Sequence, residues 1–384
     1  MYDVSISGVG QTPVREHWEK SLRELAVDAL LAALHDSHLE QVEAIYVGNM
    51  LSGEIIGQEH LGALIADQAG MCGVEALKLE AACGGGAAAA RMGYLAIASG
   101  QYETVAVVGV EKMTDMSIAT ITAGLAMAAD GDYEAAQGIS FVALNAMVMR
   151  RYMYEYDLVE EDFAPFDMNA HANAVNNPYA MFHRPITLEA LRRARMIADP
   201  ISLLDSAPIC DGAAALILSR ADGLNSGRER AVRIAASAVA TDAVALHDRK
   251  DPLWLTAAEL AARKAYAQAQ VQPSDIDLFE LHDAFSIVAP MSLEAAGFAT
   301  RGTGVYVGRD GEIGINGRVP ISTMGGLKAR GHPVGASGVY QIVEAATQLR
   351  GEAGANQVPN AHVAMTQSLG GVGTTAVTHI LIKD

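Results

Sequence analysis

The sequence predicts a layered α/β fold made of two similar βα halves. Three observations carry this prediction. The 384 residues are 51% hydrophobic but only 5% aromatic, which indicates a core of Ala, Val, Leu and Ile. Helices rich in small residues pack closely against sheets in layered α/β proteins. Strand and helix patterns alternate along the chain, and the same order of elements occurs twice.

The first half begins with an apolar strand at residues 4–9. Ser21 and Glu24 then form a capping-box pattern, and apolar residues follow at helical spacing as far as Leu34. A second strand is predicted at 42–47 and a second helix at about 58–69. A further strand leads into Cys83, a helix follows it, and the next strand spans 104–110.

The second half repeats this order. A strand is predicted at 233–239, a helix begins at a second capping box formed by Thr256 and Glu259, and a strand follows at 276–281. The stretch Gly335–Gly338 then opens a helix that spans Val339 to Leu349, and a strand is predicted at 361–365. Leu260 follows Leu25 by 235 positions, and Ile276 follows Val42 by 234. This register predicts a duplication, with a site where equivalent helix N-termini face each other.

Between the halves lies a segment of different character, rich in methionine and tyrosine. Long irregular insertions commonly serve as lids or binding loops. We therefore predict three parts: an N-terminal half at 1–112, an inserted loop segment at 113–215, and a C-terminal half at 216–384. The first strands of this last part, starting at 216–218, are expected to complete the N-terminal half.

Composition excludes several functional classes. The net charge of −18 argues against a nucleic-acid partner and against an anionic membrane surface. No apolar run reaches about 18 residues, so no membrane span is predicted. The three cysteines have no C-x-x-C spacing, so neither a zinc site nor a disulfide framework is expected. We predict a cytoplasmic protein without a bound metal.

Cys83 is the first candidate for chemistry. It is followed by three glycines and a run of alanines that reads as a tightly packed helix. A cysteine at the positive end of a helix should have a pKa below the usual value of about 8.5. The alternative is a buried, inert cysteine, since this residue type is often buried.

Two histidines could act on this cysteine. His282 follows the strand 276–281, and His332 lies in a glycine-rich loop ahead of a helix. Catalysis through a cysteine needs a base for the thiol and donors for the developing oxyanion. The glycine-rich stretch at 370–373 offers backbone N–H groups for that second task.

Five stretches in this order resemble the thiolases, and most closely the archaeal and sterol-carrier types with His-Asp-x-Phe. The matching stretches are 82–86, the Asp-Gly-Ala-Ala at 211–214, His-Asp-Ala-Phe at 282–285, Gly-His-Pro-Val-Gly-Ala-Ser-Gly at 331–338, and the glycine-rich C-terminal loop.

The resemblance implies a five-layer αβαβα fold, a loop segment over the site, and homodimers or tetramers. It implies that Cys83 is acylated and that His332 activates it. His282 and His332 would form one oxyanion site, and the backbone N–H groups of Cys83 and Gly370 the other. Coenzyme A would be the substrate and product, held near the stretch that contains Ser206, Asp211 and Gly212.

The chain departs from the family at one point. Most thiolases have a second cysteine, acting as acid and base, where this chain has Ser368, and the sterol-carrier type can place a cysteine where this chain has Ala284. Ser368 is the substitute by position, but its hydroxyl is too weakly acidic to replace a thiol unaided. We hypothesise that His282 handles the proton in the carbon–carbon step.

The predicted activity is an acetyl-CoA C-acetyltransferase that condenses two acetyl-CoA molecules or cleaves a 3-ketoacyl-CoA. Two alternatives stay open. One is a ketoacyl synthase, which shares the Cys-His-His set. The other is a non-catalytic thiolase-like subunit that binds acyl-CoA or a partner enzyme. The archaeal resemblance suggests a hydroxymethylglutaryl-CoA synthase or a small acyl-CoA-binding protein as partner.

Overall fold

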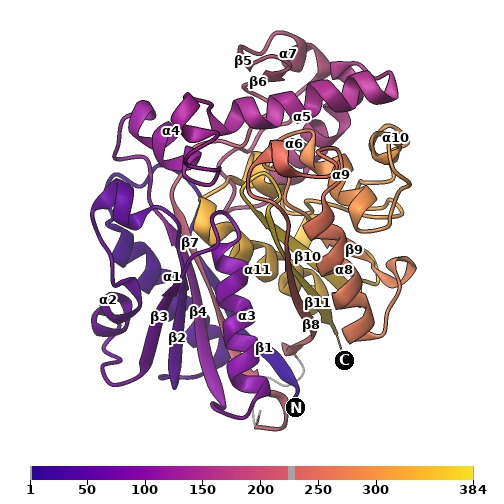
Figure 1. Ribbon diagram of the computed structural model, residues 1–384. Coiled ribbons are helices and arrows are strands. Elements are labelled where there is room, and N and C mark those ends of the chain that lie inside the picture. Colours follow the sequence, from indigo (N-terminus) through magenta and orange to yellow (C-terminus); the bar gives the residue numbers. More distant parts are fainter. Residues whose placement is uncertain (1, 224–229, 384) are drawn as a thin grey trace.

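A single bent sheet organises the molecule (Figure 1). The computed structural model describes residues 2–223 and 230–383; residues 1, 224–229 and 384 of the predicted halves lie outside that part. Within it, nine strands pair in the order β3-β2-β4-β7-β1-β8-β11-β10-β9. Their bounds are β1 Val4–Gln11, β2 Ala44–Gly48, β3 Glu75–Leu79, β4 Thr104–Glu111, β7 Gly212–Arg220, β8 Val232–Thr241, β9 Leu278–Glu280, β10 Val363–Gly370 and β11 Thr375–Ile382.

The strand order reads as a mirrored repeat and so confirms the predicted duplication. In the first arm β2, β4, β7 and β1 are consecutive, and in the second β9, β10, β11 and β8 are consecutive. In both arms the second of the four strands pairs in parallel with the first and antiparallel with the third. In the first arm β3 pairs in parallel with β2. In the second arm β9 takes the place of β2, and the corresponding pairing is a single parallel bridge between Phe279 and Ile321.

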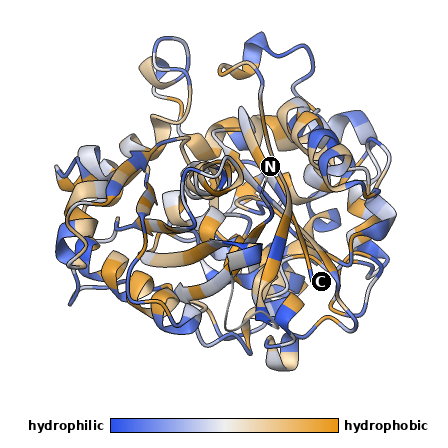
Figure 2. Cartoon of the chain, turned by 90° about the horizontal axis from the view of Figure 1, so that it is seen from below, coloured by the Kyte–Doolittle hydropathy of each residue, from blue (hydrophilic) through white to orange (hydrophobic). Residues whose placement is uncertain are grey.

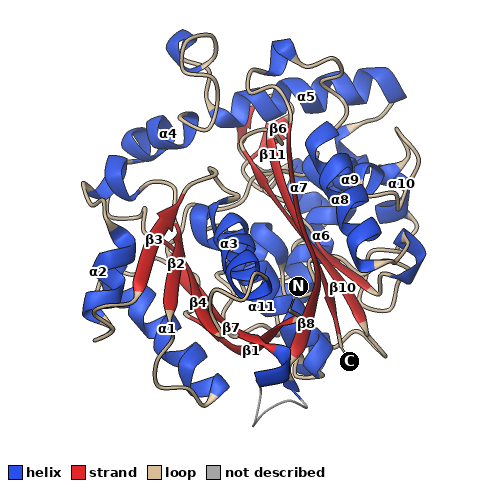
Figure 3. Cartoon of the chain, turned by 60° about the horizontal axis from the view of Figure 1, so that its bottom comes forward, coloured by secondary structure: helices blue, strands red, loops and turns tan. Residues whose placement is uncertain are grey.

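The two arms fold toward each other and enclose two helices, which gives five layers (Figure 3). Helices α3 (Gly85–Ala98) and α11 (Ser337–Arg350) lie between the arms and contact strands of both. Helix α1 (Leu22–Ser37) packs on the outside of the first arm, as α8 (Thr256–Ala269) does on the second. Helices α2 (Leu61–Gln68), α9 (Val288–Ala295) and α10 (Gly304–Arg309) complete the outer layers.

Side-chain alternation in β4 explains how the sheet is covered on both faces. Val105 and Val107 join the core cluster of α3 and α11, whereas Ala106 and Val108 join that of α1 and α2. Successive side chains of a strand point to opposite faces, so a strand with a helix on each side is apolar throughout. Figure 2 shows the resulting hydrophobic colouring along the strands.

The central helices approach so closely that their contact needs glycine. A Cβ placed on Gly338 of α11 would lie 2.5 Å from the backbone nitrogen of Ala87 in α3. A Cβ placed on Gly86 would lie 2.7 Å from the carbonyl oxygen of Gly335. Real Cβ atoms do not approach other atoms this closely, so the small residues fix the spacing of the two helices.

Two local expectations about helix starts have different outcomes. The capping box of Ser21 and Glu24 forms at α1 as predicted. The box predicted for Thr256 and Glu259 is wrong, because α8 has Leu255 at its N-cap without a side-chain cap. The carboxylate of Glu259 instead accepts a hydrogen bond of 2.7 Å from the indole N–H of Trp254.

The segment after β4 covers one end of the layers (Figure 1). Its elements are α4 Ile118–Ala126, α5 Phe141–Tyr156, α6 Ala164–Ala174, α7 Leu188–Arg192, β5 Met196–Ala198 and β6 Ile201–Ser202. Strand β7 already begins at Gly212, so the predicted segment 113–215 runs into a strand that pairs with β4 and β1. None of the helices in residues 2–223 and 230–383 is long and apolar enough to cross a membrane.

Candidate active site

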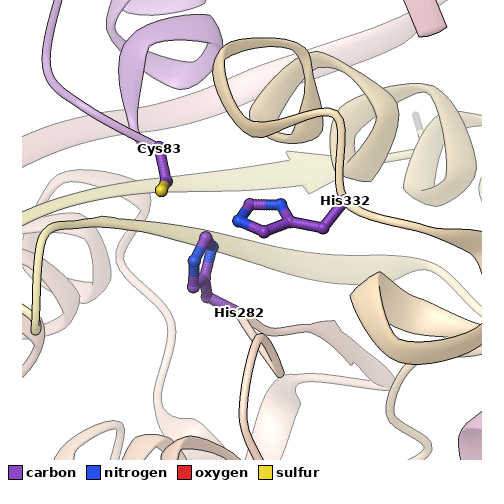
Figure 4. Close-up of side chains that lie close together, drawn as sticks. All are labelled: Cys83, His282 and His332. Atoms are coloured by element: carbon purple, nitrogen blue, oxygen red, sulfur yellow. The ribbon is translucent and has the colours of Figure 1, made fainter. Parts of the chain in front are cut away.

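Three side chains from distant parts of the chain meet at one end of the central helices (Figure 4). Cys83 precedes α3, His282 follows β9, and His332 precedes α11. The sulfur and one ring nitrogen of each histidine lie within 4.8 Å of one another, and all three residues are buried. The fold thus brings together Cys83 and the two histidines that the sequence singled out.

A strained turn presents Cys83. Ala82 has φ of +49°, a left-handed conformation that non-glycine residues rarely adopt. The N–H of Gly84 donates to the carbonyl of Ala81 at 3.0 Å, and α3 then begins at Gly85. Such a conformation costs on the order of 1 kcal/mol or more and is commonly found where an active site needs it. No pattern in the sequence pointed to Ala82.

The resting thiol of Cys83 is harder to ionise than the helix position led us to expect. Burial, followed by the negative charge of Glu111, raises the pKa of Cys83 to about 12. The predicted lowering of this pKa is therefore wrong. The field of α3 is smaller than the cost of placing a charged sulfur in a closed apolar environment. A thiol with this pKa is protonated at physiological pH.

A serine hydroxyl holds the ring of His332. Its Nδ1 lies 2.7 Å from the hydroxyl oxygen of Ser337, and this hydroxyl in turn lies 3.3 Å from the carbonyl oxygen of Pro333. If the hydroxyl donates to the carbonyl, it accepts from Nδ1–H, which leaves the lone pair on Nε2. Figure 4 shows the far end of the His332 ring directed toward Cys83 and His282.

His282 stands edge-on to His332, with ring centroids 5.1 Å apart. Its Nδ1 is buried and has no hydrogen-bond partner among the described residues. Burial, followed by the charge of Arg330, lowers the pKa of His282 to about 3. Burial, His282 and Arg330 lower the pKa of His332 well below its usual value. Both rings are therefore neutral at physiological pH.

The neighbour of His282 anchors the loop that leads to His332. The carboxylate of Asp283 accepts hydrogen bonds from the N–H of Leu327 at 2.7 Å and from the hydroxyl of Ser322 at 3.0 Å. Because Leu327 lies only five positions before His332, this carboxylate couples the placement of the two histidine loops.

The C-terminal glycine loop lies against the Cys83 turn. The hydroxyl of Ser368 donates to the carbonyl oxygen of Cys83 at 3.4 Å. A Cβ placed on Gly84 would lie 3.5 Å from the nitrogen of Gly370, and one on Gly370 would lie 2.3 Å from the oxygen of Ala81. Ser368 and Gly370 therefore lie beside the turn that contains Cys83.

A buried carboxylate that the sequence analysis missed joins the loops of the two halves. Glu111, the last residue of β4, accepts from the N–H groups of Met50, Leu51 and Gly335 and from the amide of Asn49, at 2.8–3.1 Å. Burial is the main cause that raises its pKa to about 7. The signal in the sequence was an acidic residue at the end of an otherwise apolar strand.

A cavity of about 590 Å³ extends from Cys83 and His332 under the inserted segment. Its wall is mostly apolar, with a few polar groups that include His171, Ser206 and Lys328. Pockets of this size hold a ligand of drug-like dimensions. Apolar residues of this wall include Met113, Ile118, Leu125, Phe141, Val142, Phe285 and Val334.

Of the three residues predicted to bind coenzyme A, Ser206 lines this cavity, whereas Asp211 and Gly212 are not part of its wall. The carboxylate of Asp211 is buried and accepts from the N–H groups of His17, Met113 and Thr114 at 2.7–3.0 Å. It also forms a 3.2 Å ion pair with Lys112. These contacts give Asp211 a structural task at the start of the inserted segment.

Cys83, His282 and His332 are also donors that a zinc ion can use. In a tetrahedral site with bonds of about 2.0–2.3 Å, neighbouring donor atoms are under about 4 Å apart. Donors up to 4.8 Å apart would have to close around the ion. The expectation of a site without metal stays a prediction.

Comparison with known proteins identifies the thiolase family over nearly the whole chain. The family model "Thiolase, N-terminal domain" matches residues 6–222, and "Thiolase C-terminal domain-like" matches residues 238–383. The chain is 45% identical to the acetyl-CoA acetyltransferase of Methanothermobacter thermautotrophicus, with both chains covered completely. It is 31% identical to human sterol carrier protein 2, covering 98% of this chain and 71% of that protein.

A solved structure has a similar fold over nearly the whole chain. The structure titled "Ltp2-ChsH2(DUF35) aldolase" superposes with a TM-score of 0.86 at 25% identity, covering 99% of this chain and 98% of that chain. Two family models that together span nearly all of the chain, a full-length relative at 45% identity and the Cys-His-His geometry lead to one conclusion: this chain belongs to the thiolase family and is an acyltransferase.

Proposed function

We propose that this thiolase transfers acyl groups between coenzyme A thioesters through an acyl-Cys83 intermediate. In one direction it condenses two acetyl-CoA molecules to acetoacetyl-CoA, and in the other it cleaves a 3-ketoacyl-CoA with coenzyme A. The observation that carries the proposal is the meeting of Cys83 with a His332 whose Nδ1 is already occupied by Ser337.

The acylation step follows from the protonation states. As the sulfur of Cys83 attacks the thioester carbonyl, Nε2 of His332 takes the thiol proton. The new carbon–sulfur bond forms on Cys83, the bond to the coenzyme A sulfur breaks, and His332 returns the proton to that leaving sulfur. A neutral thiol beside a neutral imidazole avoids a permanent ion pair in a closed site, so charge develops only during the reaction.

Two sets of donors serve the two oxyanions. The backbone N–H groups of Cys83 and Gly370 are proposed for the acylation oxyanion, which forms next to the Cys83 turn. The imidazole N–H groups of His282 and His332 are proposed for the enolate oxygen of the second acetyl-CoA, with His332 then in the tautomer that carries its proton on Nε2 while Nδ1 accepts from Ser337.

His282 is proposed as the acid and base of the carbon–carbon step. It takes a proton from the methyl carbon of the second acetyl-CoA, that carbon attacks the acyl carbonyl, the bond to Cys83 breaks, and His282 passes the proton to the released sulfur. Ser368 is less suited because its hydroxyl is weakly acidic and donates to the Cys83 carbonyl. Ala284 offers no proton at all.

Coenzyme A is proposed to enter through the cavity past Ser206. Arg195 also lines this cavity, is exposed, and forms no ion pair within residues 2–223 and 230–383. A free guanidinium suits a phosphate group. Its neighbours Arg192 and Arg193 are paired with Glu161 and Glu189. We therefore propose Arg195 as a partner of the coenzyme A phosphates.

Labelled acetyl-CoA tests the proposed intermediate. The unaltered chain should carry a base-labile label on the Cys83 peptide, and Cys83→Ala should lose both label and thiolysis. Cys72→Ala, which changes an exposed cysteine, is the matched control and should retain both. Unchanged activity in Cys83→Ala would refute the proposal.

A non-catalytic acyl-CoA-binding subunit is the second candidate, favoured by the missing second cysteine at Ser368 and Ala284. It predicts tight coenzyme A binding without label or thiolysis. A ketoacyl synthase would act on acyl carrier protein and not on free coenzyme A thioesters. Assembly into homodimers or tetramers, and association with a hydroxymethylglutaryl-CoA synthase or a small acyl-CoA-binding protein, are part of the proposal.

A further inference from the structure

We propose that Arg249 is a positioning residue for acyl transfer, because it holds the loop that connects β10 to β11 beside the acylation oxyanion site. The inference rests on the proposed function, in which the backbone N–H groups of Cys83 and Gly370 bind that oxyanion. Arg249 is not part of the wall of the large cavity. It acts through the connecting loop, residues 371–374, which directly follows Gly370.

The backbone of the connecting loop is poorly suited to hold its own shape. The loop has four residues, and two of them, Gly371 and Gly373, have positive φ angles of +62° and +82°. Glycine has more conformational freedom than any other residue type. A donor in an oxyanion site has to stay about 2.7–3.1 Å from the oxyanion. A glycine-rich loop next to such a donor therefore needs contacts from elsewhere in the fold.

Arg249 supplies these contacts from the turn that follows β8. Its Nη1 donates to the carbonyl oxygen of Val372 at 2.6 Å, and its Nη2 donates to the hydroxyl of Thr374 at 3.1 Å. Its Nε donates to the carbonyl oxygen of Ala243 at 3.3 Å, which anchors the guanidinium in its own turn. Because the guanidinium is planar and rigid, it fixes two points of the loop at once.

The opposite side of the loop region lies against the turn that contains Cys83. A Cβ placed on Gly370 would lie 2.3 Å from the carbonyl oxygen of Ala81, so the two backbones are in close contact. Arg249 and His282 both line a small cavity of about 20 Å³, the size of one water molecule, together with residues 371–373. The guanidinium thus lies close behind the active site, and a shift of the loop would move Gly370 relative to Cys83.

Arg249 is buried without a counter-charge, which distinguishes it from two other arginines with fully buried side chains. Arg330 pairs with Glu344 at 2.9 Å, and Arg350 pairs with Asp36 at 2.7 Å. Within residues 2–223 and 230–383, the hydrogen-bond acceptors of Arg249 are all uncharged. A buried charge without an opposite charge costs stability, and such costs are commonly found at functional sites.

Two carboxylates act on the charge of Arg249 without pairing with it. Burial lowers the pKa of Arg249, and Asp242 and Glu134 offset part of this effect. Asp242 accepts from the N–H of Ala243 at 2.8 Å, and Glu134 accepts from the N–H of Leu246 at 2.7 Å. Both carboxylates therefore fix the turn from which Arg249 reaches the loop.

Single-turnover acylation of Cys83 tests the inference with two substrates, acetyl-CoA and the dithioester analogue in which sulfur replaces the carbonyl oxygen. Sulfur accepts hydrogen bonds weakly, so a well-placed oxyanion site favours the oxygen substrate. Arg249→Met should lower the rate with acetyl-CoA about tenfold or more and the rate with the analogue much less. The oxygen-to-sulfur rate ratio should therefore fall. A loss of folded protein alone would lower both rates in proportion and leave this ratio unchanged.

Thr374→Val removes one acceptor in the loop and is the second variant if Arg249→Met fails to fold. It should lower the ratio about threefold, whereas Thr374→Ser keeps the hydroxyl and should leave the ratio unchanged. Arg350→Met is the matched control, because this buried arginine is the last residue of α11, at the end remote from His332. Asp36 would keep its ion pair with Arg230 at 3.1 Å, and the ratio should equal that of the unaltered chain.

The outcomes separate this inference from the proposed function. An acyl-Cys83 label in the unaltered chain, with a ratio that neither Arg249→Met nor Thr374→Val lowers, would overturn the role of Arg249 and leave the intermediate intact. A ratio that falls as far in Arg350→Met as in Arg249→Met would also overturn this role. Absence of both label and thiolysis in the unaltered chain would overturn the proposed function and, with it, the role of Arg249.

Discussion

The hydroxyl of Ser337 lies 2.7 Å from Nδ1 of His332, at the first residue of the helix that His332 precedes. The same hydroxyl reaches the carbonyl of Pro333, so it has one role as acceptor from the ring and one as donor to the backbone. This arrangement favours the imidazole tautomer with its lone pair on Nε2, the nitrogen at the far end of the ring from Ser337. Ser337 thus fixes the orientation of the His332 ring, and under the proposed function it is a positioning residue.

Ser337→Ala should lower the rate of Cys83 acylation about tenfold or more, because the ring loses its preferred tautomer and orientation. Ser337→Thr keeps the hydroxyl and should restore most of the rate. Single-turnover label transfer and its pH profile provide the measurement. Ser292→Ala, which removes a buried hydroxyl without a hydrogen-bond partner in the described structure, is the matched control. Equal rates in Ser337→Ala and the unaltered chain would contradict this role.

His282→Ala should separate the two half-reactions. The label on Cys83 should still form, since His332 remains to take the thiol proton. Condensation and thiolysis should fall about 100-fold or more because the carbon–carbon step loses its acid and base. His332→Ala should lose both half-reactions. If His282→Ala stopped acylation as strongly as condensation, His282 would have a different task.

Gly338→Ala should force α3 and α11 apart. The added methyl would lie 2.5 Å from the nitrogen of Ala87, and overpacking of this kind costs about 1–3 kcal/mol of the free energy of unfolding. Activity should fall as well, since both helices carry active-site loops at their N-termini. Urea unfolding gives the measurement. Gly131→Ala is the control: a Cβ there meets nothing within 4 Å, so stability should change by less than about 0.5 kcal/mol.

His379 should make stability depend on pH. It is buried in β11, where burial lowers its pKa to about 4. Below pH 6.5 the unfolded chain binds a proton at this position that the folded chain does not bind until about pH 4, so stability is lost as the pH falls through this window. At pH 5 the loss is about 2 kcal/mol. His379→Gln should remove it, which urea unfolding at pH 5 and pH 7.5 would detect.

Exposed His247→Gln is the matched control for that measurement. If the unfolding free energy of His379→Gln and that of the unaltered chain changed in parallel between the two pH values, His379 would not be the source of the acid sensitivity.

The parts of the fold that depend on periodicity were predictable. Alternating or uniformly apolar strands such as β4 and the capped helix α1 appear where the pattern places them. The mirrored strand order also follows from the order of strand and helix patterns, which occurs twice in the sequence. Cys83, His282 and His332 could be selected because each is a chemically active residue at a strand-to-helix junction, and duplicated halves bring such junctions together.

The parts that depend on tertiary contacts were not predictable. Glu259 resembled the partner of an N-cap residue, but its carboxylate accepts a hydrogen bond from the indole N–H of Trp254 instead. The pKa of Cys83 depends on burial and on Glu111, neither of which is visible in the local sequence. The left-handed turn at Ala82 has no sequence signal, because alanine is not a residue that usually adopts it. Asp211 looked like a ligand-binding residue and is engaged inside the protein.

The glycine contacts between α3 and α11 have a consequence for how such an enzyme diversifies. The spacing of the loops that carry Cys83 and His332 is held by peptide groups, which have no rotamers to exchange, whereas the wall of the cavity is built from side chains. Mutations in the inserted segment can therefore reshape the cavity without altering the distance between Cys83 and His332. The spacing of the two loops and the shape of the cavity can thus change independently.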